Sequence, residues 1–281
     1  MAVLLTGKEV SNAVKERVAE GVKTLTQSGI TPTLAILRVG ERPDDLSYER
    51  SAIKVAATLG IEARSIVLPA DATQEQIEVA IDGINNDASI HGCLMFRPLP
   101  KGIDETALCN RLDARKDMDG IGLSSLAGIF AGTGQGYAPC TAQACIEICD
   151  YYNVPIQGKR VVVIGRSLVI GKPVSMLFLQ RNATVTICHS RSENLAEITR
   201  EADVVVCATG RAKAYDARYF SAGQTVIDVG INVDDQGNLC GDVNFDSVEP
   251  TVAAITPVPR GVGSVTTALL MEHVVKAASM A

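Results

Sequence analysis

Residues 159–173 read KRVVVIGRSLVIGKP, and this stretch decides the fold of the second half of the chain. The apolar run over 159–164 predicts a buried strand. Gly165 and Gly171 follow it, before an apolar helix that reaches about residue 180. A strand, a glycine turn and a helix hold pyrophosphate in dinucleotide-binding folds, because the N–H groups at the helix N-terminus face the anion. The glycines are spaced Gly-x5-Gly rather than G-x-G-x-x-G, so the turn alone is a weak signal, and any strand–turn–helix unit can need glycines.

The segments on either side alternate between strand and helix patterns. In the second half we expect strands over 183–189, 203–208 and 225–229, and helices over 141–153, 195–201 and 264–278. In the first half we expect helices over 7–28, 46–59 and 73–86, and strands over 32–39, 63–68 and 92–97. This order predicts an α/β protein with mostly parallel sheets and helices on their faces. Residues 122–138 are rich in Gly, Ser and Ala and predict a loop-like linker.

The end of the second strand of this nucleotide-binding pattern indicates which dinucleotide fits. Sites that prefer NAD have Asp or Glu there to hold the ribose hydroxyls. This chain has His189, Ser190 and Arg191 instead. With Arg166 from the glycine turn, two guanidinium groups and a hydroxyl suit a 2′-phosphate, which favours NADP. The alternative is that these are solvated loop residues. For Arg191 alone, a solvated loop position and a phosphate contact are equally favoured.

Composition excludes several classes of function. The 281 residues carry a formal net charge of −6, which argues against nucleic acid as the main partner, since phosphate binding needs a basic field. No apolar run is long enough for a transmembrane helix, and the N-terminus lacks a signal-peptide pattern. The eight cysteines form no C-x-x-C pair. We therefore expect a cytoplasmic protein with reduced core thiols, no metal site and no membrane partner.

Several short motifs occur together in the chain. They are APCT at 138–141, KDMDG at 116–120, GRS at 165–167, VIGKP at 169–173, ATVT at 183–186, IDVGIN at 227–232 and ITPVP at 255–259. In this order and spacing the sequence resembles the methylenetetrahydrofolate dehydrogenase/cyclohydrolase family, from about residue 5 to about residue 278. Because the motifs appear without long insertions between them, the resemblance is specific.

The resemblance implies two α/β domains with a cleft between them. A folate-binding catalytic domain would span 1–140 and be completed by a C-terminal helix over 264–281, and a Rossmann-like NADP domain would span 141–263. Members of the family are usually homodimers. They oxidise 5,10-methylenetetrahydrofolate with NADP, and most then hydrolyse the methenyl product to 10-formyltetrahydrofolate in the same cleft.

The resemblance also implies roles for individual residues. Tyr48 matches the tyrosine that packs on the folate, and Asp119 matches the carboxylate that hydrogen-bonds the pterin. Without the resemblance, Tyr48 would be half-buried packing and Asp119 a solvated loop charge. The positions that match the folate loop are Pro257, Val258 and Gly261. Those that match NADP contacts are Gly165, Arg166, Ser167, Ser190 and Ile231.

The chain departs from the family pattern at three positions. The family has lysine four residues after the tyrosine, where this chain has Ala52. Lys54 is rotated from that position by about 200° around the helix and cannot replace it. Phe96 occupies the position of the glutamine that partners this lysine, and Arg97 beside it is a poor substitute because neighbours on a strand face opposite sides. Arg260 replaces a glycine. Arginine does not easily take a positive φ, so we expect this loop to differ or to meet the acidic tail of folate.

These departures affect the two reactions differently. Hydride transfer to the nicotinamide mainly needs alignment of donor and acceptor carbons. Hydrolysis needs proton transfers, for which a positioned acid–base is worth ~10²–10⁴-fold. We therefore expect an NADP-dependent dehydrogenase with weak or absent cyclohydrolase activity. The alternatives are a bifunctional enzyme in which another group or a water relay replaces the lysine, a non-catalytic folate or nucleotide sensor, and an NADP-dependent dehydrogenase of a small cyclic acid.

Overall fold

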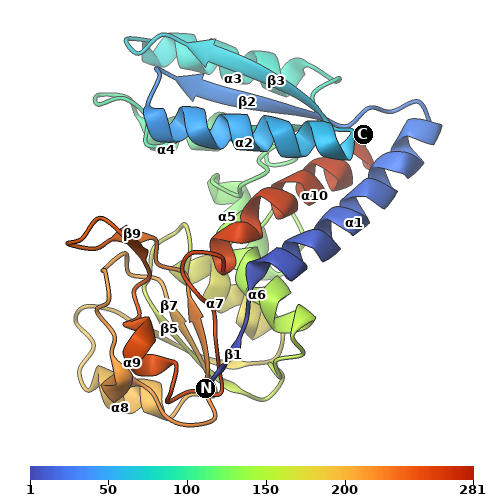
Figure 1. The fold of residues 1–281 in the computed structure, drawn as a ribbon. Coiled ribbons are helices and arrows are strands. Elements are labelled where there is room, and N and C mark those ends of the chain that lie inside the picture. The colour runs from blue at the N-terminus through green and yellow to red at the C-terminus, as the bar shows by residue number, and fades with distance from the viewer. The chain divides into compact units, whose positions relative to one another are not determined.

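The computed structural model describes residues 1–281, which form two compact units (Figure 1). Residues 1–12 and 141–266 make up the six-stranded unit, and residues 13–140 and 267–281 make up the three-stranded unit. Each name refers to the main sheet of the unit. None of the helices is long and apolar enough to cross a membrane.

The three-stranded unit is built on a parallel sheet with the strand order β3-β2-β4. The strands are β2 (Thr33–Val39), β3 (Glu62–Leu68) and β4 (Gly92–Met95). The central strand β2 is buried at every position. It is covered on both sides, because α2 (Pro43–Leu59) and α3 (Gln74–Asn86) lie on opposite faces of the sheet (Figure 1).

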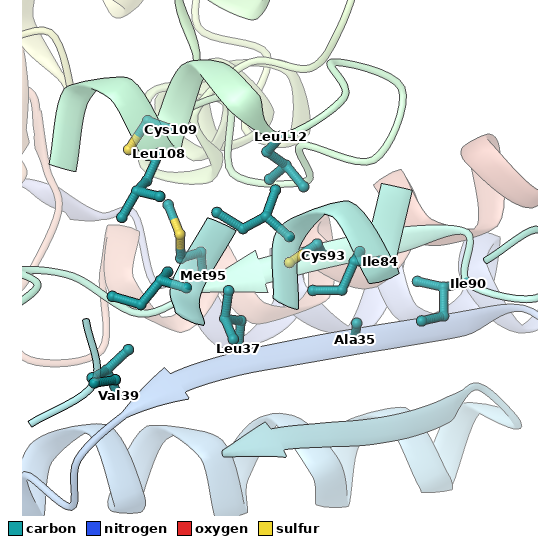
Figure 2. Close-up of a cluster of buried hydrophobic side chains, with 13 residues drawn as sticks. Ala35, Leu37, Val39, Ile84, Ile90, Cys93, Met95, Leu108, Cys109 and Leu112 are labelled. Atoms are coloured by element: carbon teal, nitrogen blue, oxygen red, sulfur yellow. The ribbon is translucent and has the colours of Figure 1, made fainter. Parts of the chain in front are cut away.

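One face of this sheet carries the main core of the unit. Successive strand side chains point to opposite faces, so Ala35, Leu37 and Val39 of β2 share one side. Figure 2 shows these side chains with Ile84 of α3 and Leu108 of α4 (Glu105–Arg111), all of them buried. The residues between them on β2, including Arg38, face α2.

A helix replaces the linker that the sequence predicted over 122–138. This helix, α5 (Leu123–Ala131), begins after Gly122 and ends at Gly132, whose φ of 67° closes it. The glycines that suggested a loop stand at the helix ends, where they act as caps. Gly128 lies within the helix because a Cβ there would overlap the carbonyl oxygen of Gln135. The helices α1 (Gly7–Gln27) and α10 (Thr266–Ala278) each begin in the six-stranded unit and run into the three-stranded one.

The six-stranded unit contains one parallel sheet with the order β1-β11-β8-β7-β5-β6, as the sequence predicts for an α/β fold. Its strands are β1 (Val3–Leu4), β5 (Arg160–Ile164), β6 (Thr184–Cys188), β7 (Val204–Cys207), β8 (Thr225–Asp228) and β11 (Ala254–Ile255). A separate antiparallel hairpin joins β9 (Asn232–Val233) to β10 (Leu239–Cys240). The helices of the unit are α6 (Cys140–Tyr151), α7 (Gly171–Gln180), α8 (Leu195–Arg200) and α9 (Phe245–Val248).

The structure corrects two of the expected boundaries. The first 12 residues belong to the six-stranded unit and not to a domain over 1–140, because β1 pairs in parallel with β11. A strand of two residues is too short to leave a periodic signal in the sequence. The strand expected over 92–97 ends at Met95, which places Phe96 and Arg97 beyond the regular ladder.

Candidate active site

The glycine turn after β5 is shaped by close backbone approach. Gly165 has a φ of 133°, and a Cβ there would overlap the carbonyl oxygen of Ala208. A Cβ on Gly171 would overlap the carbonyl oxygen of Gly165. The hydroxyl of Ser167 accepts hydrogen bonds from the N–H groups of Ile170 (3.1 Å) and Gly171 (3.4 Å). The start of α7 is thereby fixed directly after the turn, which is the arrangement that binds pyrophosphate.

A recess of about 570 Å³ opens beside this turn. Four of the five residues that the sequence assigned to NADP contacts through the family resemblance line it: Gly165, Arg166 and Ser167 come from the turn, and Ser190 follows the end of β6. Arg191, the further candidate, is exposed and does not line the recess. His189 does line it, with its Nδ1 accepting the N–H of Arg191 at 3.2 Å, so Nε2 is the ring nitrogen left for a ligand.

Two buried aspartates that sequence reasoning did not single out as site residues hold the far wall of this recess. Asp242 is fully buried and accepts hydrogen bonds from the N–H groups of Thr209, Gly210 (3.1 Å) and Arg211 (2.9 Å). The carboxylate of Asp228 accepts the N–H of Asp242 at 3.0 Å, and burial raises the pKa of Asp228 to about 7. A carboxylate that satisfies several consecutive N–H groups fixes a loop, so this pair holds residues 209–211 in place. The sequence does hold one indication of a structural role for Asp228, since this charged residue stands within the apolar run 226–229.

A second, mostly apolar recess of about 260 Å³ lies in the same unit. The loop residues predicted to line the folate site, Pro257, Val258 and Gly261, do border it, as does Ile231. Arg260 also lies on its wall. The expectation that arginine would avoid a positive φ is wrong, since Arg260 has a φ of 82°. Its carbonyl accepts the N–H of Gly7 at 2.7 Å, and this tie holds the loop in the conformation that a glycine would adopt.

In the three-stranded unit, the tyrosine helix presents the expected residues. Tyr48 on α2 is half-buried, and its ring meets the ring of Phe96 edge to face with 5.8 Å between centroids. Ala52 is fully buried one turn further along, whereas Lys54 is exposed. The structure therefore brings Tyr48 and Phe96 together, and no lysine stands beside them.

Asp119 lies in the same unit, in the loop before α5. It is half-buried, and its Oδ1 accepts the N–H of Cys140 at 3.2 Å. Burial raises the pKa of Asp119 above its usual value, while the amide of Cys140 and the positive charge of Arg97 act in the opposite direction. Arg97 thus reaches Asp119 electrostatically, which the strand-alternation argument did not foresee because β4 ends before it. The neighbouring Asp117 has a structural role, since it accepts the N–H groups of Ile121 and Gly122.

A buried ion pair lies between α2 and β2. Arg38 Nε donates to Glu49 Oε2 at 2.8 Å, and both side chains are about 7% exposed. Ser65 of β3 also donates to Glu49. Both of these partners of Glu49 are strand residues beneath the helix, so this carboxylate anchors α2 to the sheet.

Comparison with protein families covers both halves of the chain. Residues 5–119 match the catalytic domain of tetrahydrofolate dehydrogenase/cyclohydrolase, and residues 139–281 match its NAD(P)-binding domain. The chain belongs to the tetrahydrofolate dehydrogenase/cyclohydrolase family. It is an enzyme, and the family expected from the sequence motifs is confirmed.

Individual relatives match almost from end to end. The bifunctional protein FolD of Carboxydothermus hydrogenoformans is 51% identical over 279 residues, which are 99% of this chain and 97% of that protein. The protein of the same name from Clostridioides difficile is 47% identical over 277 residues, with 99% and 96% covered.

Solved structures agree with these matches. The bifunctional FolD of Campylobacter jejuni has a TM-score of 0.96 at 34% identity and covers 100% of this chain and 99% of its own. The dehydrogenase-cyclohydrolase of Trypanosoma brucei, solved with NADP and an inhibitor, has a TM-score of 0.92 at 34% identity, with 99% and 98% covered. The two-domain α/β fold and the use of NADP by a methylenetetrahydrofolate dehydrogenase are confirmed by these matches.

Proposed function

We propose that this enzyme oxidises 5,10-methylenetetrahydrofolate with NADP and hydrolyses the 5,10-methenyl product to 10-formyltetrahydrofolate. The observation that carries this proposal is the near end-to-end similarity to proteins named bifunctional, at 51% identity over 99% of the chain. The alternative drawn from the sequence, with both activities retained, is therefore preferred to weak or absent hydrolysis.

The residues of the six-stranded unit suit the dinucleotide. The N–H groups at the start of α7 and the glycine turn would hold the pyrophosphate, and Arg166 with Ser190 would hold the 2′-phosphate. When bound there, NADP accepts the hydride. Thr209 and Arg211 keep the opposite wall rigid because Asp242 binds both of their N–H groups.

The residues of the three-stranded unit suit the folate. Tyr48 offers a half-buried ring on which the pterin or the benzoyl ring can stack, and Phe96 fixes the orientation of that ring. Asp119 offers one carboxylate that can hydrogen-bond the pterin edge, with its free oxygen in a partly buried setting that strengthens such a bond. In the six-stranded unit, Pro257, Val258 and Gly261 border the apolar recess and are proposed as folate contacts on the basis of the family resemblance.

A second candidate function is a dehydrogenase with weak or absent cyclohydrolase activity. One observation favours it: Ala52 is fully buried at the position of the family lysine, with Phe96 at the position of its glutamine partner. Neither side chain can transfer a proton.

A single time course separates the two candidates. Purified protein is mixed with 5,10-methylenetetrahydrofolate and NADP, and NADPH and the methenyl product are followed together. The bifunctional proposal predicts that NADPH rises while the methenyl product drains faster than in a protein-free control. If the methenyl product persists in step with NADPH, the second candidate is correct. The control is the same mixture without NADP, to which the methenyl compound is added directly.

The remaining assignments are also proposals. We propose that the three-stranded unit with α10 is the folate domain and that the six-stranded unit is the NADP domain. We propose further that the enzyme acts as a homodimer in the cytoplasm, where its eight unpaired, buried cysteines stay reduced. Light scattering of the purified protein tests the dimer.

A further inference from the structure

A second carboxylate stands on the same side of the tyrosine helix as Ala52. In an α-helix of 3.6 residues per turn, Asp45 and Ala52 are two turns apart and differ by only about 20° in direction, with Tyr48 between them. The structure agrees: Asp45 and Ala52 are both buried on α2, and Tyr48 is half-buried. Asp45 also lies close to the carboxyl end of the parallel sheet, because α2 follows directly after β2. Ligands of parallel α/β sheets bind at that edge.

The side chain of Asp45 is mostly buried, yet its carboxylate has few partners in the protein. The residue is 8% exposed, and its only charged contact is Arg42 Nε at 3.9 Å, beyond hydrogen-bond distance. It forms no hydrogen bond with any protein group, although it occupies the third position of α2, where an acidic side chain can reach back to the helix N-terminus. Its oxygens are not cut off from solvent, since the hydroxyl of Tyr137 is the only fully buried side-chain polar atom without a hydrogen-bond partner. A mostly buried carboxylate with lone pairs still open to water can meet a ligand or exchange a proton with a water molecule.

The adjacent Asp44 shows the contrast. It is exposed, with 69% of its side chain accessible, and pairs with Arg42 at 2.8 Å. Its backbone amide and Arg42 lower the pKa of Asp44. Burial instead raises the pKa of Asp45, against the charges of Arg42 and Arg38 and with that of Asp44. Asp44 thus has the lowered pKa of a surface ion pair, whereas Asp45 has the raised pKa that is typical of proton-transfer groups.

We propose that Asp45 is the group that transfers protons in the hydrolysis of the methenyl compound, in place of the lysine that Ala52 replaces. This inference rests on the proposed bifunctional reaction and names its acid–base residue. A lysine at 52 would lean toward the helix N-terminus, as helical side chains do, and so toward the turn of Tyr48 and Asp45. The carboxylate of Asp45 therefore lies on the part of the helix surface toward which that lysine would point. From there it can exchange a proton with the substrate, directly or through one water molecule.

The chemistry balances with one carboxylate. The carboxylate of Asp45 takes a proton from a water molecule as the water oxygen bonds to the methenyl carbon, and the C=N electron pair moves to nitrogen. The carboxylic acid then returns the proton to N5 as the carbon–N5 bond breaks. The hydroxyl group loses its proton to solvent and becomes the formyl oxygen on N10. One water is consumed and one proton is released, with no change in oxidation state. A raised pKa improves both steps near neutral pH.

The test compares Asp45→Asn with Asp44→Asn in the purified full-length enzyme. Methenyl hydrolysis and methylene oxidation are measured separately, each over a range of pH. We expect Asp45→Asn to lower the ratio of hydrolysis to oxidation by ~10²-fold or more, in line with the loss of a positioned acid–base. Asp44→Asn should leave this ratio within about twofold, and Asp45→Glu should recover part of it. The acidic limb of the pH profile of hydrolysis should be present in the wild type and absent in Asp45→Asn.

The outcomes separate this inference from the proposed function. If the wild-type enzyme hydrolyses the methenyl compound and Asp45→Asn does so at the same rate and with the same pH profile, the inference is wrong and the proposed function stands. If the wild-type enzyme does not hydrolyse it, both are wrong. A thermal melt and the oxidation rate of Asp45→Asn show whether the variant is folded, and if it is not, Asp45→Glu carries the comparison through its shifted pH profile.

Discussion

The two units use buried carboxylates in opposite ways. In the six-stranded unit, Asp242 accepts hydrogen bonds from three consecutive N–H groups, from the hydroxyl of Thr209 and from the amide of Asn232. In the three-stranded unit, Asp45 is also buried but accepts no hydrogen bond from the protein. A carboxylate whose lone pairs are all used fixes the backbone, and one whose lone pairs are free can act on a ligand. Burial alone therefore does not distinguish a structural acid from a reactive one; the count of its donors does.

The largest expected effect is at Asp242. Asp242→Ala leaves the N–H groups of Thr209, Gly210 and Arg211 without their acceptor, so we expect the free energy of unfolding to fall by about 3–5 kcal/mol. NADP binding should weaken with it, because Thr209 and Arg211 line the recess that we propose for the cofactor. Urea denaturation and cofactor titration measure both. Asp235→Ala, an exposed change in the turn of the β9–β10 hairpin that precedes Asp242, is the control, and equal effects in both variants would refute the contrast.

The next effect tests whether Asp45 and the missing lysine serve one purpose. In an Asp45→Asn background, Ala52→Lys with Phe96→Gln should raise methenyl hydrolysis by ~10-fold or more, since a positioned acid–base returns to the same helix surface. Because Ala52 is fully buried, we expect the pair of changes to cost about 1–3 kcal/mol of unfolding free energy. Initial rates with the methenyl compound and a melt give both values. No gain over Asp45→Asn would show that the site has diverged beyond these positions.

A smaller effect concerns pH and the C-terminal helix. His273 on α10 is buried, with Nδ1 2.7 Å from the carbonyl oxygen of Met118, to which it donates. Burial lowers the pKa of His273 below its ordinary 6.5, so the unfolded chain binds this proton more readily than the folded one. Stability from this group is present above about pH 6.5 and is lost as the pH falls. Wild-type unfolding free energy should therefore drop on acidification.

His273→Asn keeps an N–H donor near the position of Nδ1 but cannot titrate. We expect its unfolding free energy to fall less steeply between pH 7 and pH 5 than that of the wild type, by at most the slope of one proton, about 1.4 kcal/mol per pH unit. Denaturant titrations at several pH values measure the slopes. Parallel curves would show that other groups carry the pH dependence.

The smallest effect is expected at Arg260. A non-glycine residue at a φ of 82° carries backbone strain, and Arg260→Gly removes it. We expect the unfolding free energy to rise by about 1 kcal/mol or less, because the added freedom of glycine in the unfolded chain offsets part of the gain. A thermal melt measures this. Lys213→Gly, at another positive φ of 50°, is the comparison: it also loses the ion pair between Lys213 and Asp234, so we expect a smaller gain than at Arg260.

Much of the fold could be predicted from the sequence, and the failures have physical causes. The longer strands and helices have clear periodicity, and β5 with its glycine turn is placed as expected. The strands β1 and β11 have two residues each, too few to show a hydrophobic period. The sequence therefore does not predict that residues 1–12 belong to the six-stranded unit. The glycine-rich segment before α6 predicts a loop but forms the helix α5. Its glycines cap this helix and let the helix pack closely, which composition does not reveal.

The sequence predicts the candidate site residues only where they belong to a motif of the family. Tyr48, Asp119 and the glycine turn were found through the family resemblance, and the structure places Phe96 against Tyr48. The sequence does not single out Asp45 or Asp242, because an aspartate at the start of a helix or just after a short hairpin usually lies in solvent. Their difference from ordinary surface aspartates is burial and the number of donors around them, and both depend on residues distant in the sequence.

The division of the chain has a consequence for how it is made. Residues 1–12 are synthesised before residues 13–140, yet their strand β1 pairs with β11, which is synthesised after them. The three-stranded unit is also completed late, because α10 places Val274 against Gly92 and His273 against Met118 only after residues 141–266 have been synthesised. Neither unit is a continuous stretch of the gene: a nascent chain cut short before β11 lacks the partner of β1, and one cut short before α10 lacks the last element of the three-stranded unit. The six-stranded unit can therefore be completed before α10 is synthesised, whereas the three-stranded unit, although most of its residues come earlier, is completed last.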